Sequence, residues 1–357
     1  MKKLTVGAAL LAALALALSG CAQPPASSTL SGGDASSSDF LACMVSDAGG
    51  FDDKSFNESG YNGLKQAESE LGVKIQTAES KNANDFTPNL KNMVSQNCGL
   101  TITVGFNLAE ATKAQATETP DAKFAIVDDE SIDLPNVKPL VFKTSDAAFL
   151  AGYLAAGYSK SGIVGTFGGI AIPSVTIFMD GFADGIAQYN ADNGKSVKLL
   201  GWDKDKQDGL FTGDFEDESK GQNTTKQFID QGADVVMPVA GPVGNGAAAA
   251  AKAAGDVAII WVDSDGYETN PTYKDLFLTS VMKQIGPAVY DSVKEASSDA
   301  FTSTKYVGTL ANGGVGIAPY HDFDSKVDAA LKQQIEDYTA KIVSGEYKVT
   351  SPGDPTA

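Results

Sequence analysis

Short apolar runs separated by polar stretches recur along the chain from residue 40 onward. Each run is brief and rich in Val, Ile, Leu and Ala, which is typical of strands buried on both faces. We expect strands at Leu41–Ser46, Val73–Ala78, Leu100–Gly105, Phe124–Val127, Val137–Phe142, Ile163–Phe167, Val197–Trp202, Val235–Val239, Ala258–Val262 and Leu276–Val281. The repetition of such runs predicts a fold built on extended sheets.

Helical stretches lie between most of the predicted strands. In Ser55–Leu71, the residues Phe56, Leu64 and Ala67 recur at near-helical spacing, and Lys326–Val343 is a closing helical stretch. Repeated strand–helix units predict parallel sheets covered by helices on both faces. Because so many strands exceed what one small sheet holds, the pattern predicts an α/β protein of two doubly wound, Rossmann-like lobes.

The first residues follow a different pattern. Two lysines precede an almost unbroken apolar run, Leu4–Leu18, which is shorter than the roughly 20 residues that span a bilayer. Small residues and Cys21 follow at once, as in a lipobox, whose cysteine thiol takes a diacylglyceryl group. We therefore predict a signal peptide at residues 1–20 and a lipid on Cys21. An ordinary cleaved signal that happens to hold a cysteine is the alternative.

Composition separates a tether from the part that folds. Residues 21–39 consist mostly of Pro, Ser, Gly and Ala, which bury too little surface to fold, so we expect a flexible tether. The remaining residues are enough for two domains. The net charge is −18, from 45 acidic and 27 basic residues, which repels a phosphate backbone and argues against nucleic-acid binding.

Cysteine and histidine are scarce, which limits the chemistry. Cys43 and Cys98 are the remaining cysteines, and in an exported protein they form either a disulfide or two free buried thiols. The single histidine, His321, leaves no good transition-metal site and little for Ser-His or Cys-His catalysis. We expect no catalytic residues, no metal and no cofactor.

Residues just after the strands deserve the closest inspection, because ligands of doubly wound sheets bind beyond the carboxyl ends of the strands. Asp47 ends the first strand, and Ser55 with Glu58 three residues later has the spacing of a capping box. That box would place Phe56 and Asn57 in the first helical turn, facing the ligand crevice. The ring of Phe56 would then stack on a ligand, or pack in the core under the helix.

These residues belong to a set of motifs. The first motif comprises Asp47, Gly49, Gly50, Asp53, Ser55, Phe56 and Asn57. Further motifs are Phe124–Asp128, Gly213–Asp217 with Lys220 and Gly221, Ala233–Val236, Val239–Gly241, Trp261–Asp265, Leu278–Lys283 and Gly316–Tyr320. In order and spacing the set resembles the basic membrane protein family, the nucleoside-binding lipoproteins of ABC importers, which have the type I periplasmic-binding-protein fold.

The resemblance implies a role for each matching residue. Phe56 and Phe215, one from each lobe, would sandwich a nucleobase, since aromatic stacking suits the flat faces of a base. Asp128 would accept hydrogen bonds from base nitrogens, with Asn57 beside it, and Asp47 would bond at the same side. Together these residues would form the base end of a nucleoside site.

The sugar end would be held by Asp263 and Lys283, because a carboxylate accepts from a diol and an ammonium donates to it. Gly241 would let the backbone approach the sugar closely. From residue type alone, a solvated surface charge would be the favoured interpretation of Lys283. Two alternatives stay open at the base end. Asp129 directly follows Asp128 and could be the carboxylate that faces the ligand, and Phe211, which precedes Phe215 in a long, charged loop, could be the stacking ring.

The resemblance also implies two lobes that close around the ligand by hinge motion. Three crossings are expected, near 144–147, 267–275 and 311–319. The first lobe would comprise residues 40–145 and 276–312, and the second lobe residues 146–275 and 313–350.

The leading hypothesis is a monomeric receptor, anchored by lipid on the outer face of the cytoplasmic membrane, that delivers nucleosides to an ABC permease. Purines are favoured, because two phenyl faces suit a large ring system. One alternative is a receptor of the same fold for a sugar or sugar-like signal. Another is a surface nucleoside hydrolase, for which Asp47, Asp52 and Asp53 would supply the carboxylates.

Overall fold

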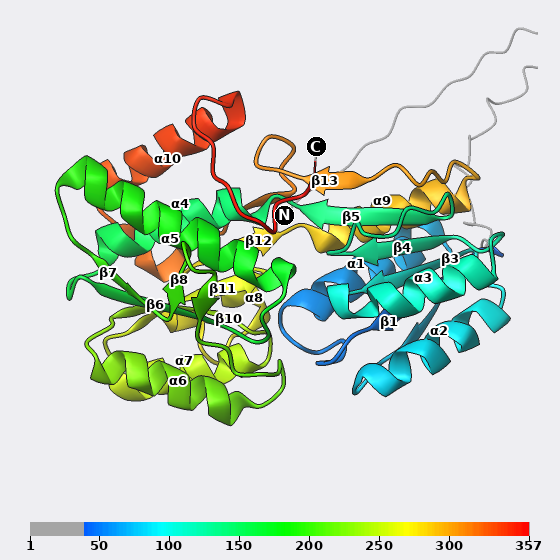
Figure 1. Cartoon of the computed structure of the whole chain (residues 1–357), viewed down its shortest axis with the longest axis horizontal. Helices are drawn as coiled ribbons and strands as arrows, with labels where there is room; N and C mark the ends of the chain where they lie inside the picture. The colour runs from blue at the N-terminus through cyan, green and yellow to red at the C-terminus, as the bar shows by residue number, and fades with distance from the viewer. Residues whose placement is uncertain (1–38, 357) are drawn as a thin grey trace, which may run out of the picture. The chain divides into compact units, whose positions relative to one another are not determined.

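The apolar runs form two six-stranded sheets in the computed structural model, which describes residues 39–356 (Figure 1). The described residues belong to one compact unit. In spatial order the first sheet contains β13 (Tyr306–Gly308), β5 (Val137–Phe142), β4 (Phe124–Val127), β3 (Leu100–Val104), β1 (Leu41–Ser46) and β2 (Lys74–Ala78). All of its neighbouring strands are parallel.

The second sheet repeats this plan with one exception. In spatial order it contains β14 (Val315–Ile317), β12 (Phe277–Lys283), β11 (Ala258–Asp263), β10 (Val235–Val239), β6 (Ile163–Gly168) and β7 (Lys198–Leu200). Only β14 is antiparallel to its neighbour. The strand predicted at Val197–Trp202 is divided, because Gly201 (φ 85°) separates β7 from a short hairpin of β8 (Trp202–Asp203) and β9 (Asp208–Gly209). The predicted α/β class is confirmed.

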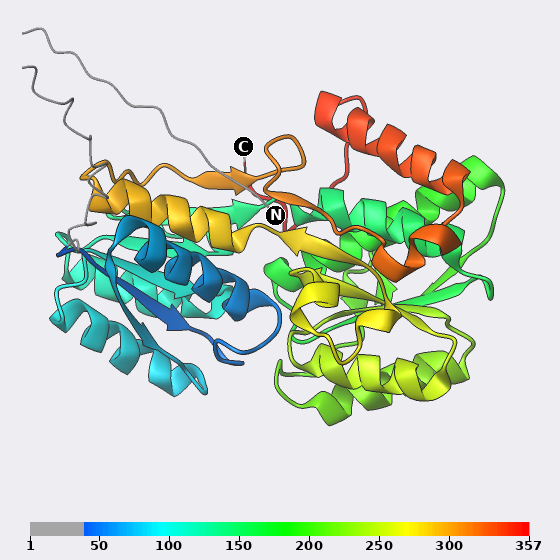
Figure 2. The same ribbon diagram turned by 180° about the vertical axis from the view of Figure 1, so that it is seen from behind.

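Helices cover both faces of each sheet. The first lobe consists of the first sheet with α1 (Phe56–Leu71), α9 (Ile285–Ser297), α2 (Phe86–Ser95) and α3 (Ala109–Glu118). The second lobe consists of the second sheet with α4 (Thr144–Tyr158), α5 (Pro173–Asn193), α10 (Ala329–Ser344), α6 (Glu218–Asp230), α7 (Val243–Ala254) and the short α8 (Gly266–Thr269). Short 3₁₀ turns lie at Ala83–Asp85, Phe106–Leu108, Lys274–Leu276 and His321–Lys326. Figure 2 shows the same layers from behind.

Burial on both faces explains why the strand sequences are continuously apolar. In β1, Ala42 and Met44 belong to the hydrophobic cluster under α1 and α9, whereas Cys43 and Val45 belong to the cluster under α2 and α3. Successive side chains of a strand point to opposite faces, so each face of a covered sheet needs its own apolar set. Alternate residues of β1 therefore pack into two different hydrophobic clusters, one on each face of the sheet.

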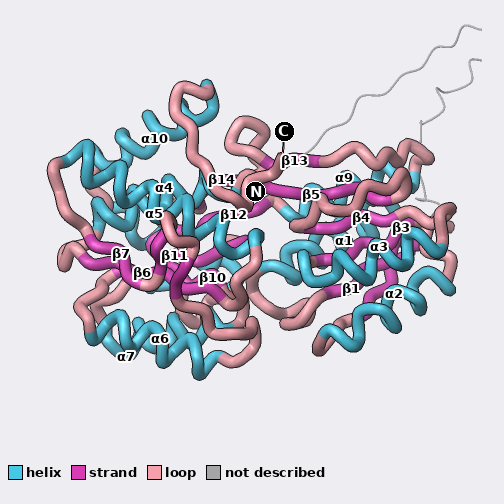
Figure 3. Tube along the Cα trace, viewed as in Figure 1, coloured by secondary structure: helices cyan, strands magenta, loops and turns pink. Residues whose placement is uncertain are grey.

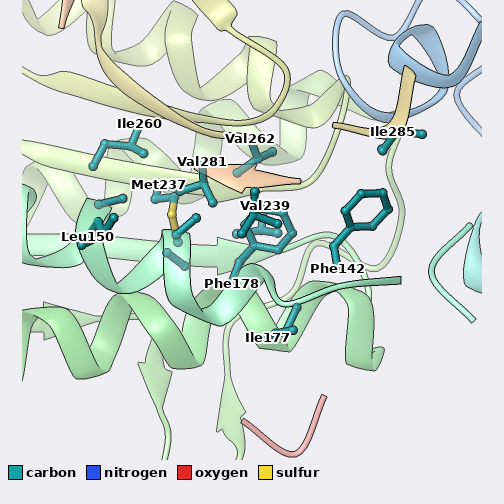
Figure 4. Close-up of a cluster of buried hydrophobic side chains, with 14 of the residues drawn as sticks. Phe142, Leu150, Ile177, Phe178, Met237, Val239, Ile260, Val262, Val281 and Ile285 are labelled. Atoms are coloured by element: carbon teal, nitrogen blue, oxygen red, sulfur yellow. The ribbon is translucent and has the colours of Figure 1, made fainter. Parts of the chain in front are cut away.

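One hydrophobic cluster continues from the first lobe into the second. Figure 4 shows part of it, in which Phe142 and Ile285 belong to the same cluster as Phe178 of α5. Second-sheet residues Val239 and Val281 pack in the same cluster. A shared core of this kind supports the two lobes where the chain passes between them.

The predicted place of the second crossing is wrong. Strand β12 pairs in parallel with β11, so residues 277–283 lie in the second sheet, not in the first lobe. The chain passes to the first lobe at Gln284, and α9 packs against α1. An apolar run gives the position of a strand but not its neighbours, because pairing depends on contacts distant in sequence. The other two passages lie at Lys143 and at residues 309–314.

A segment beyond the last helix runs back between the lobes, and we call residues 349–356 the return segment (Figure 3). In the second lobe, Ser351 donates from Oγ to Asp180 Oδ2 over 2.6 Å. In the first lobe, the backbone N–H of Thr356 donates to Glu130 Oε1 over 2.8 Å. Between these points the Asp354 carboxylate pairs with Lys143. The return segment thus bonds to both lobes.

Candidate functional site

The carboxyl ends of strands from both sheets border one cavity, with an empty volume of about 530 Å³ that includes its opening to solvent. Its position agrees with the general rule for doubly wound sheets. All eight residues predicted as ligand contacts line it, namely Asp47, Phe56, Asn57, Asp128, Phe215, Gly241, Asp263 and Lys283. The fold therefore brings together side chains that are spread over more than two hundred positions of sequence.

Lys283 lies at the centre of the polar wall. Its ammonium is 2.6 Å from Asp128 Oδ2 and 3.2 Å from Asp263 Oδ1, and its side chain is only 2% exposed. Burial by itself lowers the pKa of Lys283, but the two carboxylates outweigh burial and raise the pKa above its usual value. The same ammonium lies 4.7 Å from the centre of the Phe56 ring. Lys283 is thus not a solvated surface charge.

The two carboxylates beside Lys283 sit on unusual backbone. Asp128 has φ 64° and Asp263 has φ 69°, in a left-handed region that Asp tolerates better than most side chains. Burial raises the pKa of Asp128, and Lys283 opposes that rise. Asp129 instead accepts hydrogen bonds from the hydroxyl and the backbone N–H of Ser131. Of the two adjacent carboxylates, only Asp128 lines the cavity.

An amide and two carboxylates form a second polar group. Asn57 Nδ2 donates to Asp47 Oδ1 over 3.0 Å and to Asp53 Oδ2 over 3.1 Å. Because Asp53 Oδ2 also accepts from the Asn57 backbone N–H, it is an acceptor, which orients the Asn57 amide with its NH₂ toward the two acids. Its Oδ1 is buried without a hydrogen-bond partner among the described residues. The cavity wall therefore carries an acceptor that a ligand N–H or O–H can satisfy.

Asp47 is buried among other acids. Burial is the largest cause that raises its pKa to about 8, the Asn57 hydrogen bond lowers it, and the charges of Asp53 and Asp128 raise it further. Gly105 explains how the carboxylate fits. A Cβ on Gly105 would lie 2.2 Å from Asp47 Oδ2, and the φ of Gly105 is 121°. Position 105 therefore requires glycine, because the Asp47 carboxylate leaves no room for a side chain and because other residues rarely adopt this positive φ.

The predicted capping box at α1 is wrong. Asp53 caps the helix instead, with Oδ1 accepting from Ser55 N and Glu58 N, and Oδ2 from Asn57 N over 2.7 Å. The Ser55 hydroxyl makes no cap because it bonds to the end of β11 in the second lobe. Serine at this spacing is the usual signal, but an aspartate two residues earlier reaches the same N–H groups. Phe56 and Asn57 are still in the first turn, as expected.

Aromatic rings from both lobes border the cavity. Phe56 comes from α1 in the first lobe, and Phe215 comes from the loop before α6 in the second. Gly169 makes room for Phe215, since a Cβ there would lie 2.4 Å from the ring. Phe211 packs against Trp202 instead, with ring centres 6.0 Å apart and planes at 87°. Of the two candidate rings in this loop, Phe215 is the one at the cavity.

Sequence reasoning missed three contributors to the site. Asp53 was noticed only as part of a motif and as a possible carboxylate of a hydrolase, and Gly105 only as the end of a strand. Phe178 of α5 lines the cavity and lies 5.2 Å from the Lys283 ammonium. A glycine directly after a strand was a usable signal for Gly105. No sequence signal singles out Phe178, because it is an apolar residue at the helical spacing that every core-facing residue of α5 shares.

The remaining candidates lie away from the cavity. Cys43 and Cys98 form a disulfide, with Cα atoms 5.8 Å apart on the neighbouring β1 and the approach to β3. His321 bonds to Asp265 over 2.7 Å and stacks on Tyr267. Within residues 39–356, no group of three or more His, Cys, Asp or Glu is arranged to hold a metal ion. No helix in that range is long and apolar enough to cross a membrane. The predicted signal peptide and Cys21 lie outside the described residues.

Comparison with known proteins gives consistent matches over nearly the whole chain. A family model described as Bmp, ABC transporter substrate-binding protein PnrA-like, matches residues 40–352. The ABC transporter nucleoside-binding protein BmpA of Lactococcus lactis subsp. cremoris is 32% identical, over 96% of this chain and 99% of that protein. Basic membrane protein A of Borreliella burgdorferi is 30% identical, over 85% of its own sequence and 84% of this one.

Solved structures share the fold. An ABC transporter system solute-binding protein from Aeropyrum pernix K1 superposes with a TM-score of 0.80, over 88% of this chain and 94% of that one, at 24% identity. At this identity the likeness speaks for the fold alone. It agrees with the two doubly wound lobes described above.

Proposed function

Since this chain belongs to the Bmp family of PnrA-like ABC transporter substrate-binding proteins, as its motifs suggested, we propose that it binds a nucleoside in the cavity between its lobes. A purine nucleoside is the preferred ligand of this proposal. The observation that carries it is the pairing of Phe56 and Phe215, which come from opposite lobes and border a single cavity beside buried carboxylates.

In this proposal the nucleobase binds between the rings of Phe56 and Phe215. With one ring from each lobe, a base between them would contact both lobes at once, so its binding favours closure. Stacking on an aromatic side chain contributes about 1–3 kcal/mol per base in single-strand binders. Asn57 Oδ1, the buried acceptor without a partner, would receive a hydrogen bond from the base edge.

The ion-paired group would hold the sugar. Asp128 was expected at the base and Asp263 at the ribose, yet Lys283 contacts both carboxylates. We therefore assign Asp128, Lys283 and Asp263 to one end of the ligand, where carboxylates accept from ribose hydroxyls and the ammonium donates. Burial strengthens such contacts, because little water competes with the ligand.

Binding rather than hydrolysis suits the acidic residues. Asp53 already accepts three backbone hydrogen bonds as the cap of α1, and Asp52 is exposed and pairs with Lys54. Neither is free to activate a water molecule in the cavity. We propose that the protein performs no chemistry on its ligand and releases it unchanged.

Delivery to an ABC permease completes the proposal. A lipid on Cys21 and the tether of residues 21–39 would keep a monomeric receptor beside that permease. Replacement of Cys21 by Ser should move the protein from the membrane fraction to the medium. Retention of the Cys21→Ser protein in membranes would contradict the anchor without touching the ligand proposal.

Calorimetric titration tests the ligand. The purified protein is titrated with purine and pyrimidine nucleosides, free bases and ribose, and nucleosides should bind while ribose does not. Phe215→Ala should weaken nucleoside binding at least about tenfold, because it removes one stacking face. Phe301→Ala is the matched control, since Phe301 is partly buried at the first-lobe surface near Lys123. Binding of ribose but of no nucleoside would favour the sugar receptor.

A further inference from the structure

A single backbone carbonyl of the first lobe receives three hydrogen bonds from the second. Lys54 O, just before α1, accepts from Trp261 Nε1 over 3.1 Å, from Ser264 Oγ over 2.9 Å and from Thr269 Oγ1 over 2.9 Å. The donors lie in β11, in the loop after it and in α8. These contacts join the lobes directly, without passing through a ligand.

The next residue adds a second connection. The hydroxyl of Ser55, which is fully buried, lies 3.0 Å from both Val262 O and Asp263 Oδ2. One hydroxyl proton is shared between these two acceptors. Asp263 also borders the ligand cavity. The connection between the lobes therefore begins one residue from Phe56 and ends on a cavity carboxylate.

The backbone at Lys54 is shaped for this contact. Lys54 has φ 59°, a left-handed conformation that a long side chain rarely adopts. Its N–H donates to Glu58 Oε2 over 3.0 Å, and Asp53 holds the next N–H groups as the helix cap. Strain of this kind persists only where surrounding contacts impose it, and it concentrates at functional positions. Here the strained residue is Lys54, whose carbonyl oxygen accepts the three hydrogen bonds from the second lobe described above.

We propose that Lys54 and Ser55, with Trp261, Ser264 and Thr269, form a latch that holds the lobes closed and slows the release of ligand. Lys54, Ser264 and Thr269 are not among the residues that line the cavity, so they act as positioning residues. The effect on release rests on the proposed nucleoside function, whereas the latch itself acts on lobe closure with or without ligand.

The latch is built to open again. Ser264 Oγ and Thr269 Oγ1 are 3.2 Å apart, and Thr269 Oγ1 also lies 3.2 Å from Asp265 O, which can take its single proton when Lys54 O withdraws. Both hydroxyls thus keep partners within the second lobe when the Lys54 carbonyl withdraws. Neither hydroxyl is left stranded, which lowers the cost of opening, whereas the Trp261 N–H gives up its acceptor on Lys54.

The kinetic test uses the double variant Ser264→Ala, Thr269→Val, which removes two of the three donors to Lys54 O. Stopped-flow measurements with a nucleoside found by titration should show dissociation faster by roughly 5–50-fold, as expected for two lost hydrogen bonds. Association should change less than about threefold, because affinity differences reside mostly in dissociation. An unchanged dissociation rate would overturn the latch.

Ser292→Ala with Thr339→Val is the matched control. The hydroxyls of Ser292 and Thr339 bond within their own helices, to Ala288 O and Ile335 O. The control makes the same chemical changes without touching the lobe contact. Its dissociation rate should equal that of the unaltered protein, and equal acceleration in control and latch variants would overturn the proposal.

A ligand-free measurement separates the latch from the nucleoside proposal. With 5-fluorotryptophan, the two tryptophans give two fluorine resonances, assigned by a Trp202→Phe variant. In the latch variant the Trp261 resonance should move and gain a solvent-isotope shift. The Trp202 resonance should stay, since its Nε1 bonds to Asp180 within the second lobe. If no nucleoside binds but Trp261 responds, the nucleoside proposal fails and the latch stands. If Trp261 does not respond, the latch fails.

Discussion

At the scale of single residues, the site depends on charges that are buried rather than solvated. Lys283 neutralises part of a wall that also holds Asp47, Asp128 and Asp263. Buried ions are tolerated when they are paired and hydrogen-bonded, and removal of one partner leaves the others uncompensated. The chemistry that suits ligand hydroxyls therefore makes the site sensitive to single substitutions and to pH.

Replacement of Lys283 by Met should destabilise the protein by about 3–5 kcal/mol, because two carboxylates lose their buried cation. Urea denaturation at pH 7 measures the difference. Lys332→Met is the control, since Lys332 pairs with the exposed Asp324. Such a surface pair contributes only about 0–1 kcal/mol. Equal losses in the two variants would show that Lys283 is not the cation of a buried pair.

The pKa of Asp47 predicts a pH dependence. Its pKa is about 8 in the folded protein, against an ordinary value of 3.8 for an aspartate side chain. Between these values the unfolded carboxyl is ionised while the folded one keeps its proton, so stability falls as pH rises from about 4 to about 8. The loss is at most about 1.4 kcal/mol per pH unit. Urea denaturation from pH 5 to pH 9 should show a shallower fall for Asp47→Asn. Parallel curves would refute the raised pKa.

At the scale of elements, the start of α1 serves several purposes at once. The cap by Asp53 orders the first turn, which presents Phe56 and Asn57 to the cavity. The Ser55 hydroxyl, released from capping, reaches the second lobe. Ligand contacts, a helix cap and a lobe contact thus lie within five consecutive residues. Substitutions there should affect stability and binding together.

Asp53→Ala should destabilise the protein by about 1–2 kcal/mol, since it leaves three N–H groups of α1 without their carboxylate. It should also weaken nucleoside binding, because the turn that carries Phe56 and Asn57 loses its support. Asp328→Ala provides the comparison, because Asp328 caps α10 through Ala330 N. That variant should lose stability of similar size and keep its affinity. Weakened binding in both variants would point to general destabilisation.

At the scale of the whole molecule, the two lobes are joined by more than the three passages of the chain. A hydrophobic cluster extends through both, and the return segment bonds to each of them. Within the return segment, the Asp354 carboxylate accepts a hydrogen bond from Ser145 Oγ and forms an ion pair with Lys143. These bonds connect residues about two hundred positions apart in sequence.

Asp354→Ala should therefore lower the free energy of unfolding by about 1–3 kcal/mol, because Lys143 and Ser145 lose a partly buried partner. Asp337→Ala is the control, since Asp337 is exposed and its carboxylate accepts from the Gln333 side chain one turn earlier on the same helix, α10. Surface changes of that kind stay within about 0.5 kcal/mol. Thermal and urea denaturation of both variants measure the difference, and an unaffected Asp354→Ala protein would show that the return segment adds no stability.

Short apolar runs and near-helical spacing were enough to predict the α/β class, most of the strands and the helices near 55–71 and 326–343, but not the short strands β13 and β14. Burial on two faces demands continuous apolar runs, and that demand is local in sequence. Family motifs added Phe56, Phe215, Asp128, Asp263 and Lys283, all of which line the cavity. Their assignment to a nucleoside stays a prediction.

Only the tertiary structure decided which strands pair and which side chains meet. β12 lies in the second sheet because it pairs with β11, which no local pattern encodes. Asp53 rather than Ser55 caps α1, because the Ser55 hydroxyl finds an acceptor more than two hundred residues away. Lys283 is buried for the same kind of reason, since its two carboxylate partners come from other strands. Sequence determines the periodic and local features of this protein, and long-range contacts determine the site.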